Sequence, residues 1–148
     1  VVLLSCGQCP PGSNPDPDGT SIIVGADYTA GGSTSITASL SDDAVSTPVV
    51  ASQTATHSAW HTVIVRSTGS TIRVRVDGVN GATANTSGLG PLTLLDTTAI
   101  GCVVDGIDGS LTGTFDDGAL RHVAIADGVA WSDADCLLIE AGMTALWT

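Results

Sequence analysis

The stretch Trp60–Gly78, WHTVIVRSTGSTIRVRVDG, alternates apolar and polar side chains on both sides of a Gly69-Ser70 pair. Successive side chains of a strand point to opposite faces of a sheet, so this alternation favours two half-buried strands. A two-residue turn at Gly69-Ser70 pairs such strands antiparallel and sets Arg66 opposite Arg73. The stretch therefore predicts a β-hairpin whose two faces differ in chemistry, which is the strongest constraint on the fold.

The pleat of this hairpin assigns each side chain to one of its faces. The first face is apolar and is expected to line the core, whereas the second is expected to expose a small cationic patch. The first face carries His61, Val63, Val65, Ile72, Val74 and Val76, and the second carries Trp60, Thr62, Ile64, Arg66, Arg73 and Arg75.

The cationic patch stands out because the chain is strongly acidic. It has four Lys and Arg residues against fifteen Asp and Glu, giving a formal net charge of −11. Like charges opposite each other across a strand pair cost a few tenths of a kcal/mol, so acidic groups are expected nearby. Two readings stay open: Asp side chains of the same domain pair with Arg66, Arg73 and Arg75, or an acidic protein partner docks on their planar forks.

The composition limits the possible functions. The 148 residues fit one domain, and a hydrophobic content of 43% is enough for a core. An acidic surface repels phosphate backbones, so nucleic-acid binding is disfavoured, and no apolar run reaches the length of a membrane span. Many small β-formers and few charges suit a chain that is secreted, displayed on a surface or packed into an assembly.

Turn signals divide the rest of the chain. The Pro-rich stretch 7–19, GQCPPGSNPDPDG, predicts extended chain, so we expect an N-terminal arm over 1–19 and a domain over 20–148. The apolar start, VVLLSC, has no basic leader and reads as a short first strand or arm rather than a targeting signal. Strands without intervening helices indicate an all-β antiparallel sandwich. They are expected over 21–28, 33–40, 47–54, 91–104, 109–115 and 119–127.

A helix is expected at the C-terminal end, over 133–145. Ser132 is a good N-cap, and acids follow it in the first turn, where the helix dipole favours them. Gly142 weakens this helix. The apolar stripe at three- and four-residue spacing consists of Ala134, Leu137, Leu138, Ala141 and Ala145.

The second half resembles the laminin-G-like, or concanavalin-A-like, jelly-roll family. Four pieces carry the resemblance in order: WHTVIV (60–65), IRVRVDGV (72–79), LTLLDTTAIGC (92–102) and GTFDDGALRHVAIADGVAWSDADCLLI (113–139). The chain departs from the family at Arg75, where an aromatic is frequent, and at Trp131, where Leu is common. The resemblance implies a two-sheet antiparallel jelly-roll sandwich but little about activity, since the fold hosts lectins, glycanases, adhesion modules and virion proteins.

Carboxylates are the first candidates for chemistry. Glycoside hydrolysis needs two of them across a groove, yet Glu140 is the sole Glu and falls in the expected helix, so an enzyme is disfavoured. Asp residues on tight turns offer hard oxygen ligands, so Ca²⁺ is the one cofactor considered, although Asp-Gly pairs are first of all turn sequences. The candidate ligands are Asp105, Asp108, Asp116 and Asp117.

Cysteine and histidine offer weaker signals. The four Cys are consistent with a disulfide between Cys6 and Cys9, with one between Cys102 and Cys136, or with free buried thiols. The three His residues, His57, His61 and His122, read as structural, with His61 and His122 as packing positions on strands.

These observations together predict a non-enzymatic structural or adhesion module on a virion surface or outside the cell, most specifically a phage capsid decoration or fibre component. Its expected partners are other proteins of the assembly, such as capsid or fibre subunits or further copies of the chain. The alternative is a lectin-like glycan-binding domain of a secreted or cell-surface protein.

Overall fold

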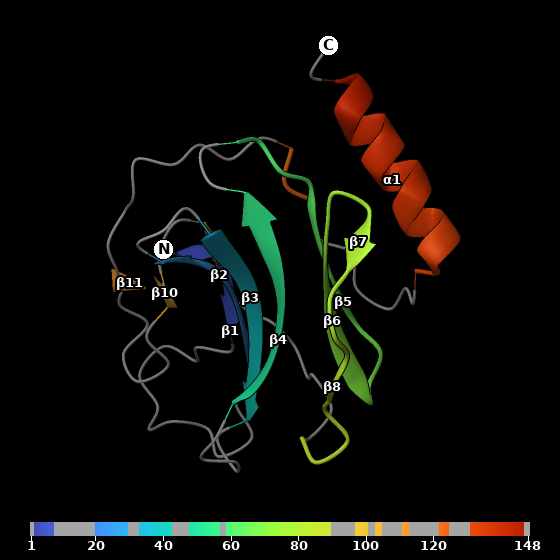
Figure 1. Ribbon diagram of the computed structural model, residues 1–148. Coiled ribbons are helices and arrows are strands. Elements are labelled where there is room, and N and C mark those ends of the chain that lie inside the picture. Colours follow the sequence, from blue (N-terminus) through green and yellow to red (C-terminus); the bar gives the residue numbers. More distant parts are fainter. Residues whose placement is uncertain are drawn as a thin grey trace.

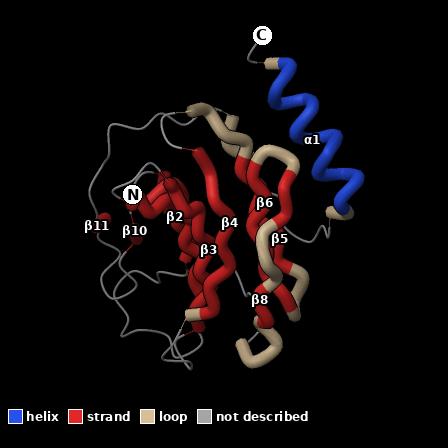
Figure 2. Tube along the Cα trace, in the orientation of Figure 1, coloured by secondary structure: helices blue, strands red, loops and turns tan. Residues whose placement is uncertain are grey.

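The computed structural model describes residues 2–7, 20–29, 33–42, 48–56, 59–89, 97–100, 103–104, 111–112, 122–124 and 131–146. Within these ranges the protein is mostly β, with antiparallel sheets and one C-terminal helix. Figure 1 shows two sheets side by side and the helix outside the second sheet, and Figure 2 separates the strands from the helix by colour. No helix in the described ranges is long and apolar enough to span a bilayer.

The first sheet has five strands in the order β4-β3-β2-β1-β9, and every neighbouring pair is antiparallel. The strands expected over 21–28, 33–40 and 47–54 are confirmed to within a few residues. The bounds are β1 (Val2–Gly7), β2 (Thr20–Thr29), β3 (Ser33–Asp42), β4 (Val49–Thr56) and β9 (Thr97–Ile100).

The apolar start of the chain is a strand. The sequence had left open whether it was a short first strand or part of an arm. β1 pairs with β2 on one side and β9 on the other, so the sheet begins at Val2 rather than at residue 20. A fully paired strand needs apolar side chains and free amides, which VVLLSC supplies before the first Pro. Residues 8–19 of the expected arm lie outside the described residues.

The second sheet contains the hairpin of β5 (Val63–Ser67) and β6 (Thr71–Val76), extended by β7 (Val79–Asn80) and β8 (Ala84–Asn85), which both pair with β6. The expected register is confirmed, with Arg66 opposite Arg73. Gly69 takes the positive φ of 38° that the tight turn requires.

The later strands differ from expectation. The described part of the stretch 91–104 holds β9 and β10 (Val103–Val104), which belong to different sheets, and β10 pairs with β11 (Leu111–Thr112), which lies within the strand expected over 109–115. The strand expected over 119–127 is absent from its described part, 122–124. His122 is exposed there with a φ of +54°, which interrupts an extended strand, so its assignment as a packing position was wrong.

The two sheets share one apolar core. This confirms that the first face of the hairpin is buried, because Ile72, Val74 and Val76 pack against side chains of the other sheet. Burying a Val or Ile side chain contributes about 1.5–3 kcal/mol, so this face anchors the hairpin. The first sheet contributes Val24, Ile36, Ala38, Leu40 and Ala51.

The helix α1 (Asp133–Ala145) confirms the expected bounds and cap. The Ser132 hydroxyl accepts the Asp135 amide, and the Asp135 carboxylate accepts the Ser132 amide, which completes a capping box. α1 turns its apolar stripe to solvent. Its buried residues are Cys136 and Glu140, while Leu137 is 56% exposed and Leu138 73% exposed.

Candidate functional site

The second face of the hairpin is covered by α1 instead of facing solvent (Figure 1). Thr62 and Ile64 are buried on this face, and Arg75 is only 4% exposed. The expected exposure of Arg75 was therefore wrong. The hairpin pattern fixes which side chains share a face, but a helix from a distant part of the chain decides whether water reaches that face.

Arg75 and Glu140 join β6 to α1. The Arg75 Nε donates to Glu140 Oε1 at 2.9 Å and the Nη2 donates to Oε2 at 3.1 Å, which is the fork-to-fork arrangement of a strong ion pair. The Gly78 amide also donates to Glu140 Oε1 at 3.0 Å, and Arg75 Nη1 reaches the Asn80 side chain at 3.2 Å. The hydrogen bond that Arg75 donates to Glu140 raises the pKa of Arg75 above its ordinary value, so the guanidinium is a permanent charge.

The need to pair Arg75 explains which side of α1 turns inward. A buried charge without a partner costs several kcal/mol, and Glu140 is the only Glu in the chain. Turning Glu140 toward Arg75 also turns in the residues at three- and four-residue spacing from it. On that side of α1 lie Cys136, four residues before Glu140, and Met143, three residues after it, with the half-buried Ile139 beside them.

Arg66 is neutralised at the other end of α1. Its Nη1 donates to the Trp131 carbonyl at 2.7 Å, and its Nη2 donates to the Asp133 carboxylate. The hydrogen bond and charge of Arg66 hold the pKa of Asp133 below its usual value. Pairing by acids of the same domain is thus confirmed for Arg66, and it holds for Arg75 with a Glu in place of an Asp. Docking of an outside partner on the three arginines stays a prediction.

Arg73 has a different environment from the other two arginines. Its Nε and Nη2 both donate to the hydroxyl of Thr83, at 2.8 and 2.5 Å, and it is part of no ion pair with the described residues. Beside it lies a groove of about 320 Å³, which we call the hairpin groove. The groove is lined by Arg66, Thr68, Thr71, Arg73 and Asp133.

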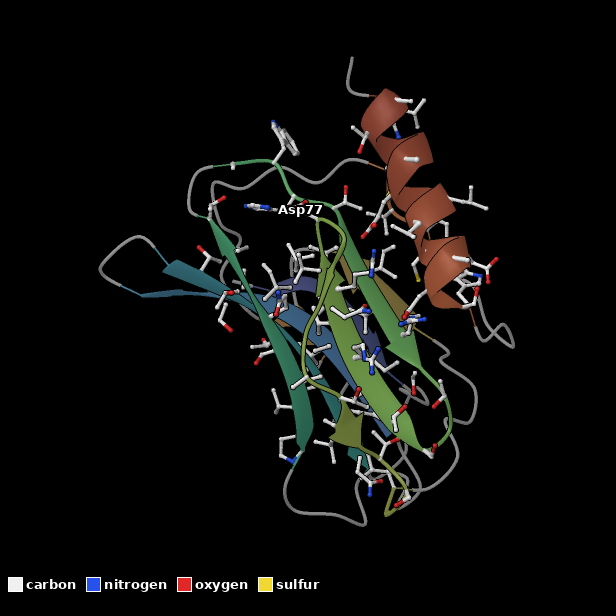
Figure 3. The ribbon with its side chains drawn as sticks, turned by 45° about the vertical axis from the view of Figure 1, so that its right-hand side comes forward. Asp77 is labelled. Atoms are coloured by element: carbon white, nitrogen blue, oxygen red, sulfur yellow. The ribbon has the colours of Figure 1, made fainter. Side chains whose placement is uncertain are left out.

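His61 and Asp77 form a second polar cluster, at the end of the sheet where β6 turns into β7. Asp77, labelled in Figure 3, has a φ of 46° and Gly78 one of 83°, as a tight Asp-Gly hairpin turn requires. The Asp77 carboxylate lies 2.6 Å from His61 Nδ1 and accepts the Thr62 amide at 2.9 Å. The cluster therefore ties this turn to the entry of β5.

The ring of His61 has an acceptor on each side. Its Nε2 lies 2.7 Å from the Thr56 carbonyl oxygen, which can only accept, and its Nδ1 faces the Asp77 carboxylate. Burial lowers the pKa of His61, but the hydrogen bonds to Asp77 and Thr56 outweigh burial and raise it above 6.5. Both nitrogens then donate, so neither is left as a base for proton abstraction.

The remaining candidates divide into described and undescribed residues. The Ca²⁺ candidates Asp105, Asp108, Asp116 and Asp117 lie outside the described residues, as does His57. The described ranges contain no group of His, Cys, Asp and Glu that could hold a metal ion. Cys136 is a free buried thiol, so the alternative of a Cys102–Cys136 disulfide was wrong.

The solvent side of α1 is apolar, and we call it the α1 outer face. It consists of the apolar stripe of the helix: Ala134, Leu137, Leu138, Ala141 and Ala145. Beside it lies a second groove of about 450 Å³, lined by Thr62, Asp77, Gly78, Leu137, Glu140, Ala141 and Thr144.

Comparison with known proteins gives no relative. No protein-family model matches the chain, and neither do any curated protein or solved structure.

Proposed function

We propose that this chain is a non-enzymatic structural or adhesion module that binds another protein of an assembly through the α1 outer face. The observation that supports the proposal most strongly is the exposure of Leu137 and Leu138, at 56% and 73%. A helix that is apolar nearly all round is normally covered on more than one side. α1 has the hairpin on its inner side, and its outer side is the surface for a partner.

The charges around α1 indicate the chemistry of this partner. Asp133 and Asp135 are exposed in the first turn, the last turn of α1 carries no basic residue, and the chain has a net charge of −11. A second copy carries the same net charge of −11, so its approach costs free energy. The occupant is therefore another protein, with an apolar strip rimmed by Lys or Arg side chains.

The reactive side chains support a role without catalysis. Both oxygens of Glu140 accept hydrogen bonds from Arg75, and the two nitrogens of His61 each face an acceptor. Groups that are held in this way join elements of the fold.

In its specific form, the proposal is a component of a virion surface, such as a phage capsid decoration or fibre protein. The two antiparallel sheets with a common core support a laminin-G-like or concanavalin-A-like jelly-roll sandwich as the scaffold. Such a scaffold presents α1 on a rigid layer, as repeated contacts with capsid or fibre subunits require. It needs no cofactor, and Ca²⁺ at Asp105, Asp108, Asp116 or Asp117 remains a prediction.

Site-specific cross-linking tests this proposal. A photoreactive amino acid replaces Leu138 in one variant and Val50, a 51% exposed apolar residue on β4, in the control. In native particles we expect position 138 to cross-link to one structural protein in fixed stoichiometry, and position 50 not to do so. That partner, once purified, should bind the wild-type chain and lose binding with Leu138→Ser. Equal cross-linking from both positions, or binding unchanged by Leu138→Ser, contradicts the proposal.

Glycan binding is the second candidate function. The side chain of Trp60 is 49% exposed at the entry to β5, and an exposed aromatic ring can stack on a sugar. A glycan array with the wild-type chain and Trp60→Ala, with and without a chelator, tests this candidate. Saturable binding that is lost in Trp60→Ala supports it, and no binding to any glycan rejects it.

A further inference from the structure

We propose that the hairpin groove binds a carboxylate group through Arg73 and the hydroxyls of Thr68 and Thr71. The groove lies between the β5–β6 turn and the start of α1, away from the Leu side chains of the α1 outer face. The inference goes beyond the proposed function, because it assigns a second surface with a different chemistry.

The charges in the groove do not cancel. Arg66 and Arg73 lie directly opposite each other across the hairpin, and one carboxylate, Asp133, faces them. Asp133 is bonded to Arg66, whereas Arg73 donates only to the neutral hydroxyl of Thr83. One positive charge therefore remains without a counter-charge among the described residues, and the Nη1 of Arg73 keeps its two hydrogens for an outside acceptor.

The two threonines provide a further donor. Thr68 Oγ1 and Thr71 Oγ1 lie 2.8 Å apart, so one hydroxyl donates to the other. The hydroxyl that accepts still has its own hydrogen, which is available to another acceptor. The Thr68 amide also donates to the Thr71 carbonyl at 2.9 Å and closes the turn. Donors held on a closed hairpin lose little entropy when a ligand binds.

A carboxylate matches this arrangement better than a phosphate does. The planar fork of Arg pairs with the two oxygens of a carboxylate, and the threonine hydroxyl adds a hydrogen bond to one of them. A single negative charge balances the single uncompensated positive charge. A doubly charged phosphate meets the Asp133 carboxylate and the net charge of −11 with twice the repulsion.

The carboxylate has two possible sources, an Asp or Glu side chain of a partner protein or a small free acid. NMR titration of the labelled chain with acetate, with a short Glu-containing peptide and with inorganic phosphate distinguishes them. We expect acetate and the peptide to shift the amide resonances of Thr68 and Thr71 and the Nε–H resonance of Arg73. If the peptide binds more tightly than acetate, the natural ligand is a protein segment. If the two bind with equal affinity per carboxylate, the natural ligand is a small acid.

Variants with matched charge test the role of Arg73. Arg73→Gln should weaken carboxylate binding about tenfold or more, the effect of losing a charged hydrogen bond. Val50→Asp makes the same change in net charge at an exposed position of β4, in the other sheet, and should leave binding unchanged. Arg73→Lys retains the charge without the fork and should give an intermediate loss, which tests the site if Arg73→Gln does not fold. Equal losses in Arg73→Gln and Val50→Asp, or tighter binding of phosphate than of acetate, would overturn the proposal.

Discussion

Arg75 and Glu140 are 65 positions apart in the chain and form a two-bond ion pair between β6 and α1, at 2.9 and 3.1 Å. The pair is buried, and the amide of Gly78 adds a third hydrogen bond to the carboxylate. Loss of either partner would leave a buried charge without a counter-charge, which is strongly destabilising. The pair therefore sets both the position of α1 and the side that α1 turns to solvent.

Removing one partner of this pair should destabilise the protein strongly. Glu140→Gln leaves the Arg75 guanidinium buried without a counter-charge, and we expect the free energy of unfolding to fall by about 3 kcal/mol or more. The double variant Arg75→Met with Glu140→Leu removes both charges and should be much closer to wild type. Urea unfolding of Arg75→Met, Glu140→Leu and the double variant gives the coupling energy. Additive effects would mean that the two side chains do not act as a pair.

The pH dependence of stability should report the environment of His61. Its pKa in the folded protein is raised above 6.5, because the hydrogen bonds to Asp77 and Thr56 outweigh burial. A raised pKa gives a stabilisation that is fully present below 6.5 and is lost as the pH rises through the folded-state pKa. The free energy of unfolding of wild type relative to His61→Gln should therefore be largest and constant below pH 6.5. It should decrease as the pH rises through the folded-state pKa of His61.

Urea unfolding across a pH series at fixed ionic strength measures this difference. Asp77→Asn is the matched control, because it keeps the shape of the side chain and removes the charge that favours the protonated ring. We expect the decrease with pH to be much smaller in Asp77→Asn. A difference between wild type and His61→Gln that does not change with pH would contradict the interpretation of His61 as a cation.

Gly81 should not tolerate a side chain. A Cβ at this position would overlap the Ser52 carbonyl oxygen of β4 and lie 3.0 Å from the Val74 carbonyl oxygen of β6. Both neighbours are backbone atoms, so the two sheets must move apart, and Gly81→Ala should cost about 1–3 kcal/mol. Gly88→Ala is the control, since nothing lies within 4 Å of its added methyl group. Thermal unfolding of both variants tests the close approach of the sheets, and equal melting temperatures would disprove it.

Replacing Gly142 by Ala should increase the stability of the protein. It lies inside α1 with no atom within 4 Å of an added Cβ, so Gly142→Ala restricts the unfolded chain without creating a clash. We expect the free energy of unfolding to rise by about 0.5–1 kcal/mol. Chemical denaturation followed by circular dichroism measures this change. A loss of stability would indicate that α1 is not helical at this position in solution.

Local sequence patterns were sufficient to predict several elements of the fold. The alternation around Gly69-Ser70 predicted the hairpin, its register and its buried face, because the period of a strand is a property of the backbone. Ser132 and the acids after it predicted the bounds and the cap of α1, since a cap needs only neighbouring residues. The short strands β10 and β11, by contrast, depend on pairing partners that no local pattern names.

The candidate site was predictable only in part. The sequence placed three arginines on one face and indicated that acids would be near them, and it placed Glu140 on the helix. It gave no sign that the arginines differ. Arg75 is buried against Glu140, Arg66 lies at the start of α1 with Asp133, and Arg73 has only Thr83 as a partner within the described part of the chain.

The sequence by itself determined the strands of the hairpin, its register and the extent of α1, because those follow from side-chain period and capping within a few residues. Only the tertiary structure decided which side of α1 meets the sheet. Hydrophobic periodicity predicted the helix, but the pairing of one buried guanidinium with the only Glu in the chain turned Leu137 and Leu138 to solvent. A buried charge needs a specific partner, whereas apolar surface can be covered by any suitable neighbour, so the charge set the orientation.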